Sequence, residues 1–283
     1  MEPPTQNTAT APPPRPARWR EALSARLFLG LAPRLPRPGK LAAAPQGSEE
    51  LSIPRPHAPT TLAATFVPAT GEARGAVLLT HPWLQWGKAY FYRSGRIDAL
   101  RAAGYHCLVF DLAGIGGSPR TPGFFHDRDV EAALEVLGSR ADGLPLHLWG
   151  VSAGGCWSHP VLARRDDVAG AVFEDVSIHL LEWSKRKAPW GRPFYAIFQY
   201  GFPDAYRYLD QRRHAPALEV RATAYVGGDR DDGVPPDETR DLAERAGGRC
   251  LIVPGARHLG AIRADRDGVI ALALETFERA VSP

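Results

Sequence analysis

From about residue 60 onward, short apolar runs alternate along the chain with longer segments whose apolar residues recur at helical spacing. The apolar runs predict strands over residues 60–68, 75–81, 106–112, 144–150, 168–176, 221–228 and 249–255. The other segments predict helices over residues 90–103, 127–137, from just after Ser152, 236–246 and 267–280. Strands alternating with helices imply right-handed crossovers. The pattern therefore predicts an α/β fold, with a mostly parallel twisted sheet and helices on both faces.

The alternation is interrupted over residues 177–220, which carry an unusual number of aromatic side chains. These are Trp183, Trp190, Phe194, Tyr195, Phe198, Tyr200, Phe202, Tyr206 and Tyr208. Because this segment lies between two predicted core strands, we expect it to form a short aromatic-rich cap insertion. Aromatic rings provide large contact areas at low entropic cost, so they favour either an apolar substrate or packing of the cap on itself and the sheet.

The N-terminal part of the chain differs from the rest in composition and charge. It is rich in proline, except over residues 17–31, where the apolar spacing predicts a short amphipathic helix. Residues 1–40 contain seven basic and two acidic side chains, so the excess positive charge lies there. We expect the helix to dock on the body of the protein, or to make weak contact with a membrane surface. The predicted division is an arm over residues 1–58 and one domain over 59–283.

Composition narrows the classes of function. The 283 residues include 34 basic and 31 acidic side chains, for a net charge of +3, and this balance argues against a nucleic-acid partner. Cys107 and Cys250 lie in predicted strands, where buried free thiols are typical of a reducing cytoplasm. No run approaches the roughly 18 apolar residues that cross a bilayer. We therefore expect a cytoplasmic protein; its oligomeric state is left open.

Ser152 lies in the segment Gly150–Gly154, which fits the pattern G-x-S-x-G after a predicted strand and before a predicted helix. In that setting the pattern predicts a sharp strand-to-helix turn that exposes the serine hydroxyl. Side chains larger than hydrogen at the flanking positions would collide with neighbouring elements. The turn also directs the first helical N–H groups, including that of Ala153, at a developing oxyanion.

A serine hydroxyl becomes a strong nucleophile when a histidine accepts its proton and a carboxylate orients that histidine. His258 lies in the loop after the last predicted strand, and acidic residues 229, 231 and 232 follow the strand before it. The chain order Ser, Asp, His and the serine motif together resemble the α/β-hydrolase superfamily, from about residue 60 to the C-terminus.

In that family the acid often lies in a G-x-x-D-x-x-V-P arrangement. Gly228, Asp231, Val234 and Pro235 match it, so the resemblance favours Asp231 over its acidic neighbours. Some relatives place the acid after the preceding strand, and Asp175 is therefore an alternative acid.

Two further segments agree with the resemblance. Residues Asp111–Ser118 are similar to the D-x-x-G-x-G-x-S turn of these hydrolases and predict a structural turn near the site. Relatives also carry a His-Gly pair whose next residue donates the second oxyanion hydrogen bond. Here the pair is His81 and Pro82; since proline has no N–H, Trp83 becomes the candidate donor. His81 is expected to be structural or to line the pocket.

The resemblance implies a serine hydrolase without a metal or organic cofactor. Its nearest branches are the esterases and the serine aminopeptidase-like relatives of lysophospholipase. The expected substrate is a carboxylic ester with a small or medium apolar acyl group, cleaved through an acyl-enzyme intermediate. Thioester, peptide and amide hydrolysis on the same triad remain alternatives. So does a non-catalytic binding or scaffold protein with this fold, recruited by its basic arm.

Overall fold

The structure is a computed structural model that describes residues 42–83, 86–119, 126–187 and 191–282. Its centre is an eight-stranded sheet in the order β1-β2-β4-β3-β5-β6-β7-β8. The strands are β1 (Glu49–Ile53), β2 (Leu62–Val67), β3 (Gly75–Thr80), β4 (Tyr105–Phe110), β5 (Leu146–Val151), β6 (Val168–Glu174), β7 (Ala222–Gly228) and β8 (Arg249–Val253). β2 is antiparallel to β1 and β4, and the other neighbouring pairs are parallel.

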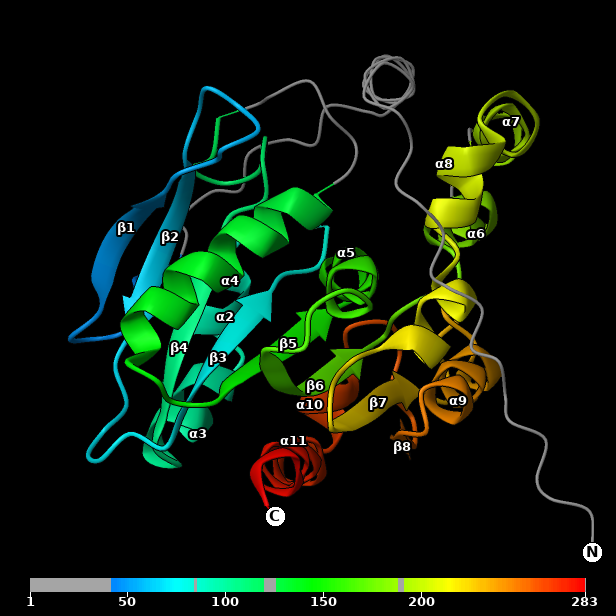
Figure 1. The fold of residues 1–283 in the computed structure, drawn as a ribbon. Helices are drawn as coiled ribbons and strands as arrows, with labels where there is room; N and C mark the ends of the chain where they lie inside the picture. The colour runs from blue at the N-terminus through cyan, green and yellow to red at the C-terminus, as the bar shows by residue number, and fades with distance from the viewer. Residues whose placement is uncertain (1–41, 84–85, 120–125, 188–190, 283) are drawn as a thin grey trace, which may run out of the picture.

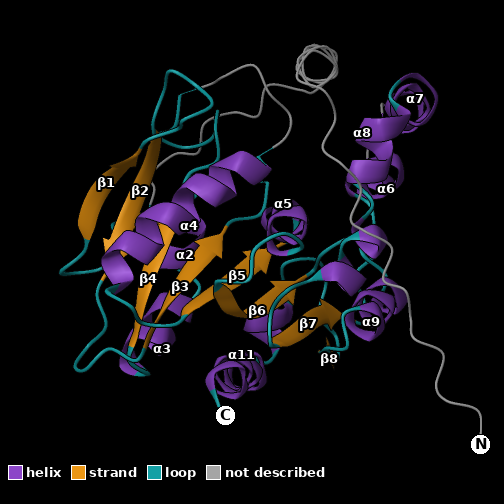
Figure 2. Ribbon diagram, viewed as in Figure 1, coloured by secondary structure: helices purple, strands orange, loops and turns teal. Residues whose placement is uncertain are grey.

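Helices cover both faces of this sheet (Figure 1, Figure 2). One face carries α4 (Asp127–Ala141), α5 (Ala153–Leu162) and α9 (Pro236–Arg245). The opposite face carries α2 (Ala89–Tyr92), α3 (Arg96–Ala102), α10 (Ala261–Ala264) and α11 (Arg266–Val281). The arrangement confirms the predicted α/β fold with a mostly parallel sheet.

The core consists of two apolar clusters, one on each face of the sheet. Every residue of β3 is buried; Leu78 belongs to the cluster under α4 and α5, whereas Val77 and Leu79 belong to the cluster under α3 and α11. Side chains alternate between the faces of a strand, so a strand buried on both faces needs an uninterrupted apolar run. This explains why each central strand appears in the sequence as an uninterrupted apolar run.

The segment between β6 and β7 folds into helices at the place predicted for the insertion. Its elements are α6 (Leu180–Lys187), α7 (Gly191–Ala196), the π-helix η1 (Ile197–Gly201), α8 (Pro203–Tyr208) and the 3-10 helices η2 (Gln211–Arg213) and η3 (Ala215–Ala217). Figure 1 shows α6, α7 and α8 grouped on one side of the molecule, above α9. We call residues 177–220 the insert.

Strand β1 lies within residues 1–58, for which the sequence predicts a proline-rich arm with a helix over residues 17–31 and no strand. Its Glu49 and Glu50 are exposed, and Ile53 is its one fully buried residue. A five-residue edge strand with so few apolar positions carries little periodic signal, and its antiparallel pairing with β2 defines it instead. The predicted helix over residues 17–31 lies outside the described residues.

Two further predictions differ in detail from the structure. The segment 90–103 contains two helices, α2 and α3, because the chain turns at Gly95, whose φ of 70° suits glycine. Cys107 is buried as predicted, but Cys250 is exposed. β8 is the last strand of the sheet, so part of its surface remains open to solvent.

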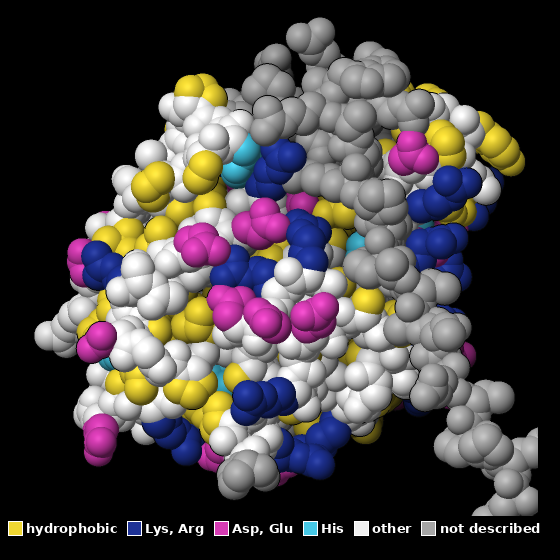
Figure 3. All heavy atoms as spheres, in the orientation of Figure 1, with side chains coloured by type: hydrophobic (Ala, Val, Ile, Leu, Met, Phe, Trp, Pro, Cys, Tyr) yellow, Lys and Arg dark blue, Asp and Glu magenta, His cyan; other side chains and the backbone are white. Residues whose placement is uncertain are grey.

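Acidic and basic side chains lie beside one another on the face shown in Figure 3. Arg164 is 2.6 Å from Glu131, and Arg165 is 2.5 Å from Asp167. This alternation does not form a continuous basic surface in the described part of that face. Within the described ranges, the structure contains no helix with the length and apolarity that a membrane span requires.

Candidate active site

Ser152 occupies a strained turn between β5 and α5. Its φ of 50° and ψ of −121° lie outside the regions that residues with a side chain normally adopt, at a cost of about 1–3 kcal/mol. The flanking glycines make the turn possible. A Cβ atom at Gly150 would lie 2.6 Å from the Cα of Gly155, and one at Gly154 would lie 2.3 Å from the carbonyl oxygen of Thr80. The backbone N–H of Ser152 donates to the carbonyl of Glu174 (2.7 Å), which ties the turn to β6.

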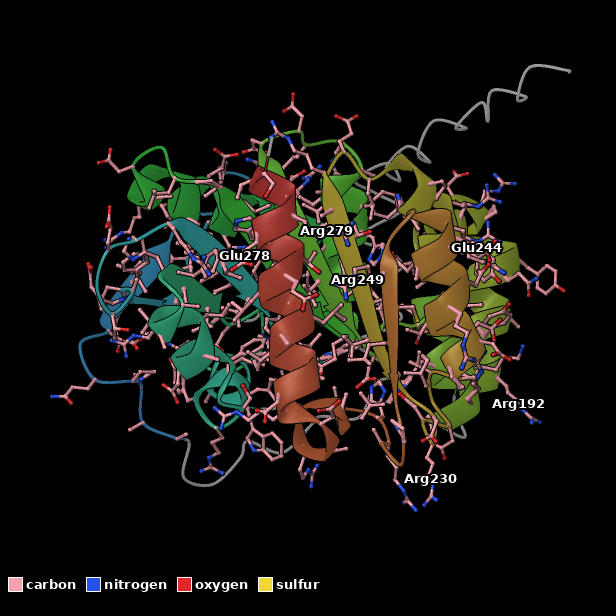
Figure 4. The ribbon with its side chains drawn as sticks, turned by 90° about the horizontal axis from the view of Figure 1, so that it is seen from below. Arg192, Arg230, Glu244, Arg249, Glu278 and Arg279 are labelled. Carbon is pink, nitrogen blue, oxygen red and sulfur yellow. The ribbon has the colours of Figure 1, made fainter. Side chains whose placement is uncertain are left out.

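The structure brings Ser152, His258 and Asp231 together. The Oγ of Ser152 is 3.1 Å from the Nε2 of His258, and the Nδ1 of His258 is 2.7 Å from the Oδ2 of Asp231. Asp231 and His258 lie in the loops after β7 and β8. Since all three segments follow parallel strands, they meet at one edge of the sheet. Figure 4 shows Arg230, beside Asp231, at that end of the molecule, whereas Glu278 and Arg279 lie toward the other end of α11.

Backbone contacts fix the carboxylate of Asp231. Its Oδ1 accepts hydrogen bonds from the N–H groups of Gly233 (2.8 Å) and Val234 (2.9 Å), and the side chain is fully buried. The loop also lies tightly against the histidine loop: a Cβ atom at Gly228 would lie 2.2 Å from the carbonyl oxygen of Ala256. The glycine and the aspartate of the G-x-x-D pattern therefore have separate roles, close loop packing and hydrogen bonding to His258.

The neighbouring acids contact other groups. Asp229 Oδ1 accepts the N–H of Gly255 (2.6 Å) and so supports the turn before His258. The side chain of Asp232 is 82% exposed and pairs with Lys187. Of the three acids in this loop, Asp231 is the one that the structure places against the imidazole.

Asp175, the alternative acid, also lies next to His258, but it hydrogen-bonds to the backbone of Leu259 and not to the imidazole. Its Oδ2 accepts the backbone N–H of Leu259 (2.6 Å), and its Oδ1 has no hydrogen-bond partner among the described residues. Burial, together with the carboxylates of Glu174 and Asp231, raises the pKa of Asp175 well above the ordinary value for aspartate. This environment favours the neutral acid, a poor orienting group for an imidazolium.

Backbone strain is concentrated around these residues. Four non-glycine residues in the described ranges have positive φ: Asp142, Ser152, Asp175 and Leu259. Three of these four belong to the site: Ser152 itself, the buried acid Asp175, and Leu259, which directly follows His258. Strain of this kind persists where the surroundings hold a residue in place, and it is often found at functional sites.

The end of β6 carries a buried ion pair that the sequence does not predict. Arg96 of α3 donates to both carboxylate oxygens of Glu174, each at 2.5 Å, and both side chains are fully buried. The guanidinium also lies 5.4 Å from the ring of Trp149. Because the carbonyl of Glu174 holds Ser152, the pair anchors the strand end on which the turn rests. Arg96 and Glu174 are 78 residues apart, so no local pattern could have indicated their contact.

The candidate oxyanion donors lie where α5 meets the loop after β3. Ala153 is the first residue of α5, and the N–H groups of a first helical turn have no partner within the helix. Trp83 follows Pro82 in the β3 loop and is half-buried. The close approach of Gly154 to the carbonyl oxygens of Thr80 and His81 (2.3 and 2.6 Å from its would-be Cβ) brings these segments into contact.

His81 supports this loop through both ring nitrogens. Nε2 accepts the N–H of Leu112 (3.0 Å), so Nδ1 carries the proton and donates to the carbonyl of Pro82 (2.7 Å). Burial lowers the pKa of His81, although the carboxylate of Asp111 opposes that effect. The ring is thus a neutral structural group, as expected from the sequence.

The segment Asp111–Ser118 also forms a structural turn. Asp111 accepts the N–H groups of Lys88 (2.6 Å) and Gly117 (2.8 Å), and the hydroxyl of Ser118 donates to the carbonyl of Asp111 (2.6 Å). Gly116, at φ of 54°, lies so close to this carboxylate that a Cβ atom would be 2.3 Å from Oδ2. The turn therefore connects the loops after β3 and β4.

One group of residues has the spacing of a metal site. Single ligand-type atoms of Asp175, Asp231 and His258 lie within 4.8 Å of one another. The Nδ1 of His258 is already bonded to Asp231, and Asp175 to the backbone of Leu259. A metal ion bound through the Nδ1 of His258 would have to replace the contact with Asp231, so the arrangement fits a hydrogen-bonded relay better.

Comparison with known proteins agrees with this geometry. A family model described as the alpha/beta hydrolase fold matches residues 75–200, from β3 through the serine turn and into the insert. The match to this model and the architecture described above agree on the α/β-hydrolase fold. No protein with a curated description matches the sequence.

Solved α/β-hydrolase-fold structures cover most of the chain at low identity. An esterase from Pyrococcus furiosus has a TM-score of 0.68 and 16% identity, covering 89% of this chain and all of its own. A thermostable carboxyl esterase from Bacillus coagulans, in complex with glycerol, has a TM-score of 0.66 and 13% identity, covering 84% of this chain and all of its own. A thermophilic esterase from Thermogutta terrifontis, with malate bound, has a TM-score of 0.60 and 18% identity, covering 83% of this chain and all of its own. These likenesses establish the fold, and the chemistry has to be argued from the site.

Proposed function

We propose that this protein is a serine esterase with the α/β-hydrolase fold that cleaves carboxylic esters through an acyl-enzyme intermediate. The observation that carries the proposal is the hydrogen-bonded series from Ser152 to His258 to Asp231, with contacts of 3.1 and 2.7 Å, on a strained serine turn. The three similar structures described as esterases add support. A protein that only binds a partner would have no use for all three groups in this alignment.

The proposed reaction has two steps. His258 Nε2 takes the hydroxyl proton while Ser152 Oγ attacks the ester carbonyl, and the N–H groups of Ala153 and Trp83 stabilise the oxyanion. The imidazolium then gives its proton to the departing alcohol, which leaves an acyl group on Ser152. Water, deprotonated by His258, attacks this acyl group and releases the acid. Throughout, Asp231 keeps the proton of His258 on Nδ1 and stabilises the imidazolium.

The insert supports an apolar acyl or alcohol group next to His258. The ring of Trp183 lies 6.0 Å from the imidazole, centroid to centroid. Other rings of the insert have packing contacts: the hydroxyl of Tyr195 bonds that of Tyr206 (2.5 Å), and Tyr208 donates to Asp127 of α4 (2.7 Å). We therefore assign substrate contact to Trp183 and structural packing to these three tyrosines.

Turnover of p-nitrophenyl esters of increasing acyl length, by wild type and by Ser152→Ala, tests the proposal. We expect the alanine variant to lose about three orders of magnitude or more in kcat. Thioester and anilide analogues with the same acyl group will separate the esterase from a thioesterase or an amidase. Equal turnover by wild type and variant would exclude a serine mechanism, and no turnover of any of these substrates would favour a binding protein.

A further inference from the structure

The first helix of the insert, α6, contacts the loop that carries Asp231. Arg186 Nη1 donates to the carbonyl of Gly233 (3.1 Å), while Nη2 of the same guanidinium pairs with Glu238 of α9. The N–H of Gly233 in turn donates to Asp231 Oδ1 (2.8 Å). One residue, Gly233, is thus held by the insert through its carbonyl and holds the acid through its N–H.

Glu238 anchors the insert at this position. Its side chain is 9% exposed, and its Oε2 accepts hydrogen bonds from the hydroxyl of Ser177 (3.3 Å) and the N–H of Ile178 (3.2 Å). The carboxylate therefore binds the insert where it leaves β6 and again near the end of α6. A largely buried carboxylate with several partners fixes geometry, because losing any partner leaves charge uncompensated.

Trp183 lies on the same side of α6. A Cβ atom at Gly233 would be 2.7 Å from the indole Nε1, so the ring packs directly on this glycine. The same ring faces the imidazole of His258. Helix α6 thus contacts both the loop of the acid and the histidine.

We propose that the insert is a working part of the site, in which Arg186 is a positioning residue that orients Asp231 through Gly233. The inference rests on the proposed esterase function. Asp231 Oδ1 accepts two consecutive N–H groups, those of Gly233 and Val234. The carbonyl of Gly233 and the N–H of Val234 belong to one peptide group, so rotation of that group would move the Val234 N–H relative to the carboxylate. Displacements of about 1 Å at catalytic groups can reduce rates about 100-fold.

Lys187 provides a matched control. It is the next residue of the same helix and pairs with Asp232 in the same loop. Asp232 is 82% exposed, and it does not contact the carboxylate of Asp231 among the hydrogen bonds of the described residues. Exposed ion pairs of this kind contribute little to stability. Lys187→Ala therefore removes a charge contact between α6 and the acid loop without touching Gly233.

The sharpest variant is Arg186→Lys. Lysine keeps a positive charge for Glu238, but one ammonium group cannot replace the fixed fork that reaches Gly233 and Glu238 together. With p-nitrophenyl acetate we expect kcat to fall about 10-fold and KM to stay within about 2-fold, whereas Lys187→Ala stays within about 2-fold of wild type in both. Arg186→Ala is the second variant, with a larger expected loss in kcat. Thermal unfolding of each variant will show that it is folded.

A double-mutant cycle tests whether Arg186 acts through Asp231. We measure the second-order rate of Ser152 labelling by a fluorophosphonate for wild type, Arg186→Lys, Asp231→Asn and the double variant. If Arg186 acts through the acid, its effect should largely disappear in the Asp231→Asn background. Independent, multiplying effects, or an Arg186→Lys enzyme as active as Lys187→Ala, would overturn the inference while the proposed function stands. A wild-type protein without Ser152-dependent turnover would instead overturn the proposed function.

Discussion

Two buried carboxyl groups lie beside His258, and their surroundings separate their roles. Asp231 bonds the imidazole and two backbone N–H groups, whereas Asp175 bonds one backbone N–H at Leu259. Burial and two neighbouring carboxylates raise the pKa of Asp175. At the residue scale, the site therefore contains one carboxylate suited to orient the histidine and a second acid, with a raised pKa, suited to hold the backbone after it.

The substitution Asp175→Asn tests this division. The amide oxygen of asparagine can still accept the N–H of Leu259, and the side chain is neutral at every pH. We expect kcat/KM for p-nitrophenyl esters to stay within about 3-fold of wild type, whereas Asp231→Asn should lower it about 10³- to 10⁴-fold. A larger loss for Asp175→Asn than for Asp231→Asn would show that the two roles are reversed.

The same variant gives a prediction for stability against pH. The pKa of Asp175 is raised in the folded state, so the folded protein keeps a proton that the unfolded chain releases above about pH 3.9. The stability from this group is fully present below that pH and is lost as the pH rises through the folded-state pKa. Urea unfolding should therefore show Asp175→Asn gaining stability relative to wild type as the pH rises above about 4. A pH-independent difference would contradict the raised pKa.

At the scale of elements, the contact between α5 and the end of β3 decides the geometry of the serine turn. The three atoms nearest a would-be Cβ at Gly154 all belong to the backbone: the carbonyl oxygen and carbon of Thr80, at 2.3 and 2.5 Å, and the carbonyl oxygen of His81, at 2.6 Å. A flexible side chain could move aside, but these carbonyls belong to the strand end and to the loop that carries Trp83. Any added atom must therefore separate α5 from the candidate oxyanion loop.

We accordingly expect Gly154→Ala to destabilise the fold by about 1–3 kcal/mol, as overpacking typically does, and to lower turnover with it. Gly201→Ala is the matched control, because a Cβ atom there meets nothing within 4 Å. Thermal unfolding and p-nitrophenyl ester turnover of both variants are the measurements. Wild-type behaviour of Gly154→Ala in both would show that the approach of α5 to the β3 loop is looser than described.

Much of the element order could be predicted from the sequence, because strands buried on both faces need uninterrupted apolar runs. β3 and β5 are predicted within one or two residues for this reason. Strand β1 could not be predicted, because an exposed edge strand that begins with two glutamates resembles a polar arm. The break between α2 and α3 depends on the positive φ of Gly95, which an isolated glycine in a helical pattern does not reveal.

At the scale of the whole molecule, loops after three parallel strands meet at one sheet edge, and this places residues 152, 231 and 258 together. These three residues could be named as candidates from the sequence, because the serine and acid loops follow spacing patterns and the histidine follows the last strand. The contacts that hold these residues in place could not be predicted from the sequence. Arg96 with Glu174, and Arg186 with Gly233, join residues 78 and 47 positions apart. Such pairs depend on the completed fold and leave no local pattern.

In the proposed reaction, the fold makes the hydroxyl of Ser152 a nucleophile activated by His258. Mass spectrometry after exposure to a fluorophosphonate tests it most directly, because the reagent bonds covalently to an activated serine oxygen with loss of fluoride. We predict modification of the peptide that contains Ser152, and labelling slowed by about three orders of magnitude in His258→Ala. Modification elsewhere, or an equal labelling rate in wild type and His258→Ala, would contradict the account.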